Sequence, residues 1–234
     1  MKKLLSFVRN EVLKARRSVV FWVVLAVFTG LPLMVGLLRE PGSDWEHYLA
    51  DLLGPVASLL VVGYSFTSAW VFGREYVDGT MKDLLVKPIA KRYSVLSKFI
   101  VITLWNELLA VLTFGAILSA GAILGIDGAT VSLIFETWLS FLSTALMIMA
   151  VCMTSALLAN VTRGYLAPIG FAFVVVIASN IVVQLGLGPY FPWTIPVLWL
   201  TESSIGTVSL IIVAAAGIVG FAGTVAWWRY AEHR

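Results

Sequence analysis

The sequence has few of the residues that make soluble surfaces and reactive sites. Charged residues form only 12% of the 234 positions, against roughly 25% in an ordinary soluble domain. A single cysteine, Cys152, makes an intrachain disulfide impossible. The two histidines, His47 and His233, lie outside the long apolar runs, and the chain has no HExxH motif and no Cys/His cluster. These absences argue against an intramembrane enzyme and give no indication of a metal site.

A phosphate-binding loop is also missing. No Gly-x-x-x-x-Gly-Lys-Ser/Thr motif occurs, so we expect that this chain does not bind ATP by that device. We predict no cofactor in the chain itself. The net charge of +3 does not indicate a nucleic-acid partner, because the basic residues are confined to particular loops.

Long apolar runs are what the sequence does contain. Hydrophobic residues form 60% of the chain, in blocks of roughly twenty, the length that crosses a hydrocarbon core about 30 Å thick. We predict an all-α membrane protein in which residues 1–234 form a single transmembrane domain. The six predicted spans are 19–38, 52–72, 99–124, 138–159, 166–187 and 208–228.

Basic residues are distributed unequally between the two sets of loops. Fifteen of the sixteen Lys and Arg residues lie in the N-terminus, the 73–98 loop, the 160–165 loop and the C-terminal tail, and only Arg39 lies in an alternate loop. Cytoplasmic loops carry the excess of positive charge. We therefore predict a multi-pass protein of the cell (inner or plasma) membrane, with both termini and the 73–98 loop in the cytoplasm.

Residues 1–18 form a basic segment with Glu11 as its only acid. This pattern is typical of an amphipathic helix that lies in the membrane interface. The alternative is a basic flank that only sets the orientation of the chain. The apolar residues that recur at helical spacing are Leu4, Leu5, Val8 and Val12.

The 73–98 loop carries the signals of one short helix. A turn signal at 78–79 precedes residues 80–83, whose sequence TMKD fits a capping box, and Pro88 removes a helix donor. We predict a helix of about two turns over residues 81–87, which is too short to be stable in water without a partner surface. Its apolar side chains on one side are Met81, Leu84 and Leu85.

The segment 186–204, between the fifth and sixth predicted spans, is apolar and aromatic but cannot form one regular helix, because three prolines break it. Irregular backbone at membrane depth occurs only where protein buries it or where it lines a cavity. A surface loop on the outer leaflet and a re-entrant segment both remain open on these residues. The three prolines are Pro189, Pro192 and Pro196.

Glu107, which follows Asn106, is the only clearly intramembrane acid. It lies about eight residues, or roughly 12 Å, into the third predicted span, where a lone charge costs a few kcal/mol. One interpretation is a polar point in a transport route, or the proton relay of an ion- or proton-coupled carrier or channel. The other is a structural hydrogen bond between helices, with a partner such as Ser65, Thr67 or Ser68.

The 73–98 loop carries an ordered set of residues beyond the short helix: Glu75, Gly79, Thr80, Asp83, Leu84, Leu85, Pro88, Lys91, Arg92 and Lys98. With these residues the loop resembles the cytoplasmic loop of type-two ABC exporter permeases. Asp83 stands where that family more often has glutamate, which keeps a capping carboxylate with a shorter reach. The overall layout is similar too: a basic amphipathic N-terminal helix, six spans and a Pro-rich outer segment before the last span.

The resemblance implies a transport subunit that is not itself an enzyme. The helix at 81–87 would be a coupling helix that docks in a groove of a separate ATPase, which would bind the ATP and Mg. Two permease copies, as a homodimer or with a sibling permease, and two ATPase subunits would form the exporter in the lipid bilayer.

The resemblance also suggests a pathway and a cargo. Residues 188–206 would form a pair of short re-entrant helices near an outer gate. Similar small permeases export peptide antibiotics (bacitracin-like or lantibiotic) or drugs, so an amphipathic or hydrophobic substrate and a role in antibiotic resistance are expected. The candidate pathway or gate residues are Asn106, Glu107, Pro192, Trp193 and Pro196.

Overall fold

The computed structural model describes residues 2–39, 44–81, 91–201 and 205–230, and over these ranges the regular elements are all helical. Six of the helices are long and apolar enough to cross a membrane, which confirms the predicted all-α fold and its six candidate spans. The helices are α1 (Lys2–Arg16), α2 (Val19–Leu37), α3 (Trp45–Val77), α5 (Lys91–Leu124), α6 (Val131–Val161), α7 (Leu166–Gln184), the 3₁₀ helix η1 (Gly188–Tyr190), α8 (Ile195–Thr201) and α9 (Thr207–Tyr230).

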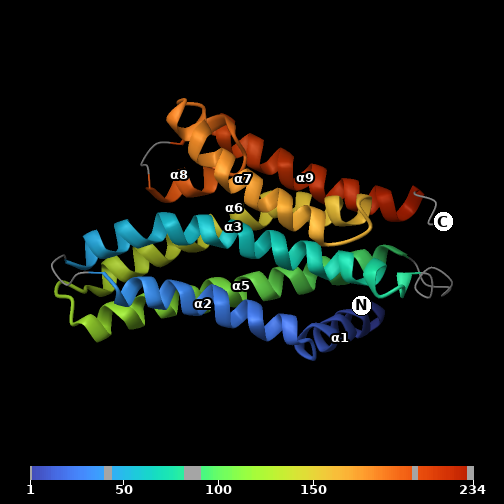
Figure 1. Cartoon of the computed structure of the whole chain (residues 1–234), viewed down its shortest axis with the longest axis horizontal. Coiled ribbons are helices and arrows are strands. Elements are labelled where there is room, and N and C mark those ends of the chain that lie inside the picture. Colours follow the sequence, from blue (N-terminus) through green and yellow to red (C-terminus); the bar gives the residue numbers. More distant parts are fainter. Residues whose placement is uncertain (1, 40–43, 82–90, 202–204, 231–234) are drawn as a thin grey trace.

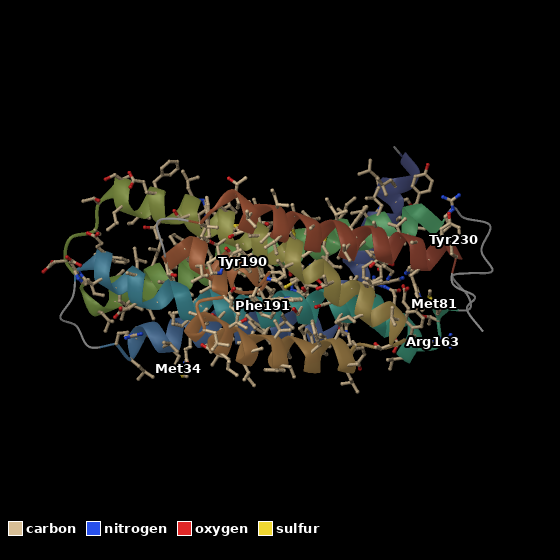
Figure 2. The ribbon with its side chains drawn as sticks, turned by 90° about the horizontal axis from the view of Figure 1, so that it is seen from above. Met34, Met81, Arg163, Tyr190, Phe191 and Tyr230 are labelled. Carbon is tan, nitrogen blue, oxygen red and sulfur yellow. The ribbon has the colours of Figure 1, made fainter. Side chains whose placement is uncertain are left out.

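The six long helices lie side by side along one direction (Figure 1), and the chain reverses at each connection. Helix α1, the end of α3, the start of α5 and the end of α9 consequently share one end of the bundle, which we call the terminal end. Figure 2 shows Met81, Arg163 and Tyr230 together at this end. The connections after α2 and α5 lie at the other end.

Three helices are longer than the apolar runs that predicted them. Helix α3 has 33 residues, α5 has 34 and α6 has 31, so each is about 45–50 Å long. Side-chain caps fix two of the new starts: Asp44 accepts a hydrogen bond from His47 N at 3.0 Å, and Thr130 accepts one from Leu133 N. The helical hydrogen bonds continue past the apolar part, and the added turns lie outside a hydrocarbon core of about 30 Å.

Helix α1 is separate from the first span. It ends at Arg16, and Ser18 begins α2 by accepting a hydrogen bond from Val20 N at 3.1 Å. Figure 1 shows α1 at an angle to α2, at the terminal end of the bundle. The predicted amphipathic N-terminal helix is therefore present, and its position in the membrane interface stays a prediction.

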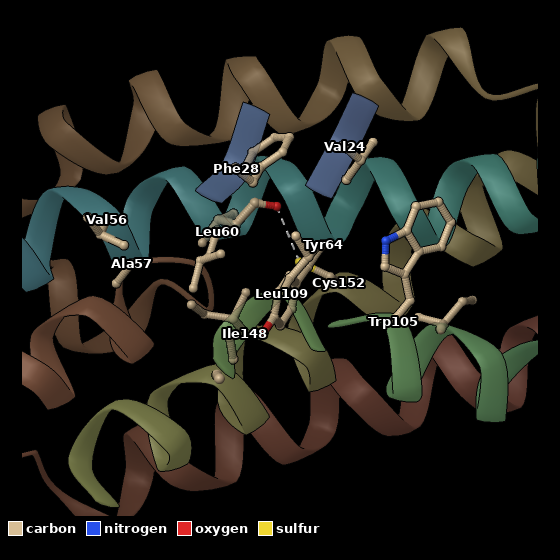
Figure 3. Packing of buried hydrophobic residues seen from close by; sticks show 14 of the residues in the cluster. Val24, Phe28, Val56, Ala57, Leu60, Tyr64, Trp105, Leu109, Ile148 and Cys152 are labelled. Atoms are coloured by element: carbon tan, nitrogen blue, oxygen red, sulfur yellow. Dashed lines mark hydrogen bonds between the residues drawn. The ribbon is translucent and has the colours of Figure 1, made fainter. Parts of the chain in front are cut away.

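Helix α3 lies at the centre of the bundle and is the most buried of the six spans. Leu60 and Tyr64 from α3 meet Leu109 from α5 and Ile148 from α6 (Figure 3), and each of these four side chains is at most 1% exposed. The core thus joins the three long helices, as close packing in a folded interior requires.

Two glycines permit very close backbone contacts. A Cβ added at Gly220 in α9 would lie 2.5 Å from Met153 C in α6, and one at Gly73 in α3 would lie 2.7 Å from Gly164 C. Neither position has space for a side chain, because the opposing atoms are backbone. Small residues are the usual means by which membrane helices approach each other.

The Pro-broken segment after α7 contains the two short helices η1 and α8. Thr194 donates a hydrogen bond to Phe191 O at 2.8 Å, and Ser209 of α9 donates one to Pro189 O at 2.7 Å. Helix α8 packs against α3 and α6, and its residue Ile195 is fully buried. Protein contacts therefore cover much of this irregular backbone. Figure 2 shows Tyr190 and Phe191 near the middle of the molecule along its long axis, away from both ends of the bundle.

Candidate functional site

The residues that flank the predicted short helix lie at the terminal end of the bundle. Helix α3 ends at Val77, and Gly79 follows with a φ of +68°, a left-handed conformation that glycine adopts without strain. Thr80 donates a 3.5 Å hydrogen bond to Glu75 O, and Met81 is only 6% exposed. Of the predicted coupling residues, Asp83, Leu84, Leu85 and Pro88, together with the side chain of Arg92, lie outside the described residues.

A largely buried cluster of five charged side chains, here called the charge cluster, joins α1 to both flanks of this loop; Lys14 alone of the five is half exposed. Glu11 of α1 accepts hydrogen bonds from Lys14 Nζ at 2.7 Å and from Arg74 Nη2 at 3.1 Å. Lys98 Nζ of α5 lies 3.4 Å from Glu11 Oε2 and 2.8 Å from Glu75 Oε1. The last contact is an ion pair without hydrogen-bond geometry, and Glu75 Oε2 has no hydrogen-bond partner among the described residues.

Three side chains of the charge cluster are buried, and their burial makes the cluster a rigid link between helices. The side chains of Lys98, Glu75 and Glu11 are 0%, 4% and 7% exposed. Removing such charges from water is expensive, so each must keep its partners. Lys98 Nζ also donates a 3.0 Å hydrogen bond to Val71 O. The cluster therefore holds the end of α3, the start of α5 and the middle of α1 in one arrangement.

The pKa of Glu11 reflects the same balance. Burial alone would raise it, but the positive charges of Lys98, Lys14 and Arg74 together outweigh burial and lower the pKa from 4.5 to about 2. Glu11 is therefore ionised at neutral pH in spite of its burial.

The sequence analysis recognised Glu75 and Lys98 as loop residues but missed their connection to Glu11. The available signal was a single acid in a segment with six basic residues. Glu11 and Lys98 are 87 positions apart, so no local pattern could pair them.

A second polar contact fixes other helices at the same end. Asn160 Oδ1, in α6, accepts hydrogen bonds from Trp228 Nε1 of α9 at 2.7 Å and from Tyr76 Oη of α3 at 3.1 Å. Asn160 is fully buried. The end of α3, which leads into the candidate coupling loop, is thus connected to α6 and α9 as well as to α1 and α5.

The structure corrects the predicted partner of the intramembrane acid. The Thr67 hydroxyl of α3 donates to Asn106 Oδ1 at 2.6 Å and not to Glu107. Thr67 Oγ1 also lies 3.0 Å from Tyr64 O in its own helix. Glu107 is half-buried, and its Oε1 has no hydrogen-bond partner in the part of the chain that the structure describes.

A groove of about 380 Å³ lies between α3, α7 and α8. Its lining is mixed: apolar side chains such as Val176 and Val183 alternate with polar ones. Trp193, one of the predicted gate residues, lines the groove and packs edge-on against Phe171, with ring centroids 5.6 Å apart. The polar lining residues are Ser58, Ser179, Asn180, Gln184, Thr194 and Thr201.

One of the predicted pathway or gate residues, Trp193, lies at this groove. Pro192 precedes Trp193 in the chain, and Pro196 is buried in α8. Asn106, Glu107, Pro192 and Pro196 are not among the residues that line the groove. Their role in a pathway or gate stays a prediction.

Six helices of spanning length are typical of a multi-pass membrane protein. Residues 7–179 match the model of the ABC-2 family transporter proteins. Because this match covers more than half of the chain, the protein belongs to that family, and it is a permease subunit that is not itself an ATPase.

Similarity to a known permease supports this family assignment. The chain is 24% identical over 198 residues to the bacitracin transport permease protein of Bacillus licheniformis, and the alignment covers 81% of this chain and 90% of that protein. The resemblance inferred from the loop residues is thereby confirmed at the level of the family. Family membership also implies a partner ATPase subunit.

Proposed function

We propose that this permease exports an amphipathic or hydrophobic substrate from the cytoplasm or the inner leaflet, driven by ATP hydrolysis on a separate subunit. The charge cluster is the observation that carries the proposal. It joins both flanks of the 82–90 segment to α1 through Glu11, Glu75 and Lys98. A displacement of that segment by an ATPase would therefore move three helices together, as a rigid-body transition requires.

The proposed orientation places the terminal end in the cytoplasm. The sequence supports it, since fifteen of the sixteen Lys and Arg residues fall in the N-terminus, the 73–98 segment, the 160–165 loop and the C-terminal tail. The ATPase, which binds ATP and Mg, would then meet the coupling residues at the cytoplasmic surface of the cell membrane. The basic surroundings would orient the partner as it docks.

The groove between α3, α7 and α8 is the proposed substrate contact. Its hydroxyl and amide groups beside apolar side chains suit an amphipathic molecule. We propose that η1 and α8 form the re-entrant segment at the outer gate, with Trp193 between the groove and the gate. The burial of Ile195 and Pro196 against the bundle supports this assignment.

The working unit is proposed to be a homodimer with two ATPase subunits. Helix α7 is the least buried of the six spans, and Val174, Ile177 and Ile181 on it are 62%, 65% and 56% exposed. A second copy would cover this face and close a pathway that one chain leaves open. Symmetric pairing of one surface is the commonest geometry of oligomers.

The substrate class follows from the relative. A peptide antibiotic of the bacitracin kind is the proposed cargo, because the relative is named for bacitracin transport and the groove here has a mixed lining. A drug or a lipid-like molecule would make the same kinds of polar and apolar contact in the groove. Export of such a compound would confer resistance to it.

Co-purification with the ATPase tests the proposal. The double change Leu84→Asp and Leu85→Asp should abolish association with the partner ATPase, and leave membrane insertion intact. The control is Leu38→Asp, an exposed leucine at the other end of the bundle. If the double variant still co-purifies and the substrate still stimulates ATP turnover, the coupling assignment is wrong.

A further inference from the structure

A second groove, of about 410 Å³, lies between α1, α2 and α5 at the terminal end of the bundle. Helix α1 contributes Val12 and Ala15, and helix α2 contributes Phe21 and Leu25. Apart from Arg16 and two indole N–H groups, the lining is hydrocarbon. This groove therefore differs from the one between α3, α7 and α8, which offers several hydroxyl and amide groups.

The depth of the groove matches one leaflet of a membrane. Its wall on α5 is a stripe at helical spacing: Val101, Leu104, Leu108 and Leu112. From Val101 to Leu112 the helix rises about 17 Å, close to half of a hydrocarbon core about 30 Å thick. An acyl chain that lies along this stripe would reach from the membrane surface to about the midplane.

The surface end of the groove carries a positive charge. Arg16 lines it, is exposed, and makes no ion pair with any residue that the structure describes. Trp22 fixes the backbone beside it, because Trp22 Nε1 donates a 3.1 Å hydrogen bond to Arg16 O. Tryptophan and arginine at this depth are typical of the membrane interface.

We propose that this groove binds one acyl chain of an anionic phospholipid, with the lipid phosphate beside Arg16. The inference rests on the proposed cytoplasmic orientation, since the cytoplasmic leaflet supplies anionic lipids. Charge complementarity selects this occupant: the groove offers one cation at its surface end and hydrocarbon along its length. An amphipathic peptide would leave its amide groups without partners here.

The bound lipid would act on the charge cluster through α1. Val12 and Ala15, which line the groove, alternate along α1 with Glu11 and Lys14, which belong to the cluster. A chain that fills the groove would contact α1, α2 and α5 at the same time. The lipid would thereby stabilise the position of α1 that Glu11 needs to reach Lys98.

Native mass spectrometry of the full chain in detergent tests the proposal, with phosphatidylglycerol and phosphatidylcholine added separately. One phosphatidylglycerol should remain on each wild-type chain, bound more tightly than phosphatidylcholine. Arg16→Gln should weaken the binding of phosphatidylglycerol about fivefold, which corresponds to roughly 1 kcal/mol for one basic residue near the membrane surface. Arg17→Gln, a change in the neighbouring exposed arginine, is the matched control and should have no such effect.

Filling the groove gives a second, independent test. Leu104→Trp should displace the lipid, and Val111→Trp should not, because Val111 lies on the same helix outside the groove. Leu104 and Val111 are 55% and 51% exposed, so both variants should fold.

Three results would overturn the proposal. They are equal binding of both lipids with no effect of Arg16→Gln, retention of lipid by Leu104→Trp, and a Leu104→Cys cross-link that shows a second copy seated in the groove. The measurement uses the chain without its ATPase, so a failure here leaves the coupling test unaffected, and a failure of coupling leaves the lipid site unaffected.

Discussion

Lys98 Nζ lies 2.8 Å from Glu75 Oε1 at a place where the two side chains are 0% and 4% exposed. Lys98 lies near the start of α5 and Glu75 near the end of α3, on either side of the segment proposed to meet the ATPase. A buried pair of this kind holds its helices together because neither charge is stable alone. The predictions below start from this contact.

Lys98→Met should destabilise the protein by about 3 to 5 kcal/mol, because it leaves buried carboxylates with fewer partners. Thermal unfolding of the purified chain in detergent measures the effect. Lys14→Met is the control: Lys14 is 48% exposed, and its loss should cost about 1 kcal/mol or less. Equal losses of stability in the two variants would show that burial does not determine how much the Lys98–Glu75 pair contributes to stability.

Adding Glu75→Gln to Lys98→Met should restore part of the lost stability. The second change removes the carboxylate that the first one leaves without its closest cation. A double-mutant cycle separates this pair from the rest of the cluster. A strictly additive cycle would contradict direct coupling between the two residues.

The stability should depend on acid pH through Glu11. Its pKa is lowered from 4.5 to about 2 in the folded state, so its contribution is fully present above pH 4.5 and is lost as the pH falls toward 2. Unfolding of the wild type and Glu11→Gln, compared between pH 7 and pH 3, measures this. The difference between them should shrink as the pH falls, and a difference independent of pH would refute the assignment.

Gly220→Val should disrupt the contact between α6 and α9. The new Cβ would lie 2.5 Å from Met153 C, so the helices must separate, at a cost of about 1 to 3 kcal/mol or more. Gly30→Val is the control, because nothing lies within 4 Å of a Cβ added at Gly30 in α2. Size-exclusion profiles and unfolding midpoints compare the two; a stable, monodisperse Gly220→Val variant would contradict the packing.

Glu107→Gln distinguishes the exporter from an ion-coupled carrier. In the ATP-driven exporter the change should leave transport in reconstituted vesicles nearly intact, whereas a carrier that used Glu107 would lose it. Glu136→Gln, on an exposed acid of α6, is the control. Transport that needs no ATPase and disappears in Glu107→Gln would favour the carrier.

The sequence was sufficient for the spans but not for their ends. Apolar runs identified the six long helices because a membrane span must satisfy its backbone internally. The first turns of α3, from Trp45, and of α5, from Lys91, are polar, so hydropathy could not detect them. Asp44 caps the first turn of α3, and a cap is a weak signal without an apolar run beside it.

The site was predictable only in part. The loop motif led to the family, and Glu75 proved to be buried next to Lys98. The partner of Glu75 and the role of Glu11 depend on tertiary contacts across 87 positions, which no local spacing contains. Thr67 was a candidate partner for Glu107, but it bonds to Asn106, one residue earlier and about 100° away around α5.

The contact between Glu11 and Lys98 also bears on biosynthesis. Translation delivers Glu11 together with its nearby partner Lys14, whereas Arg74 and Lys98 follow 63 and 87 residues later. The full set of contacts that holds α1 can therefore form only after the third span has been synthesised.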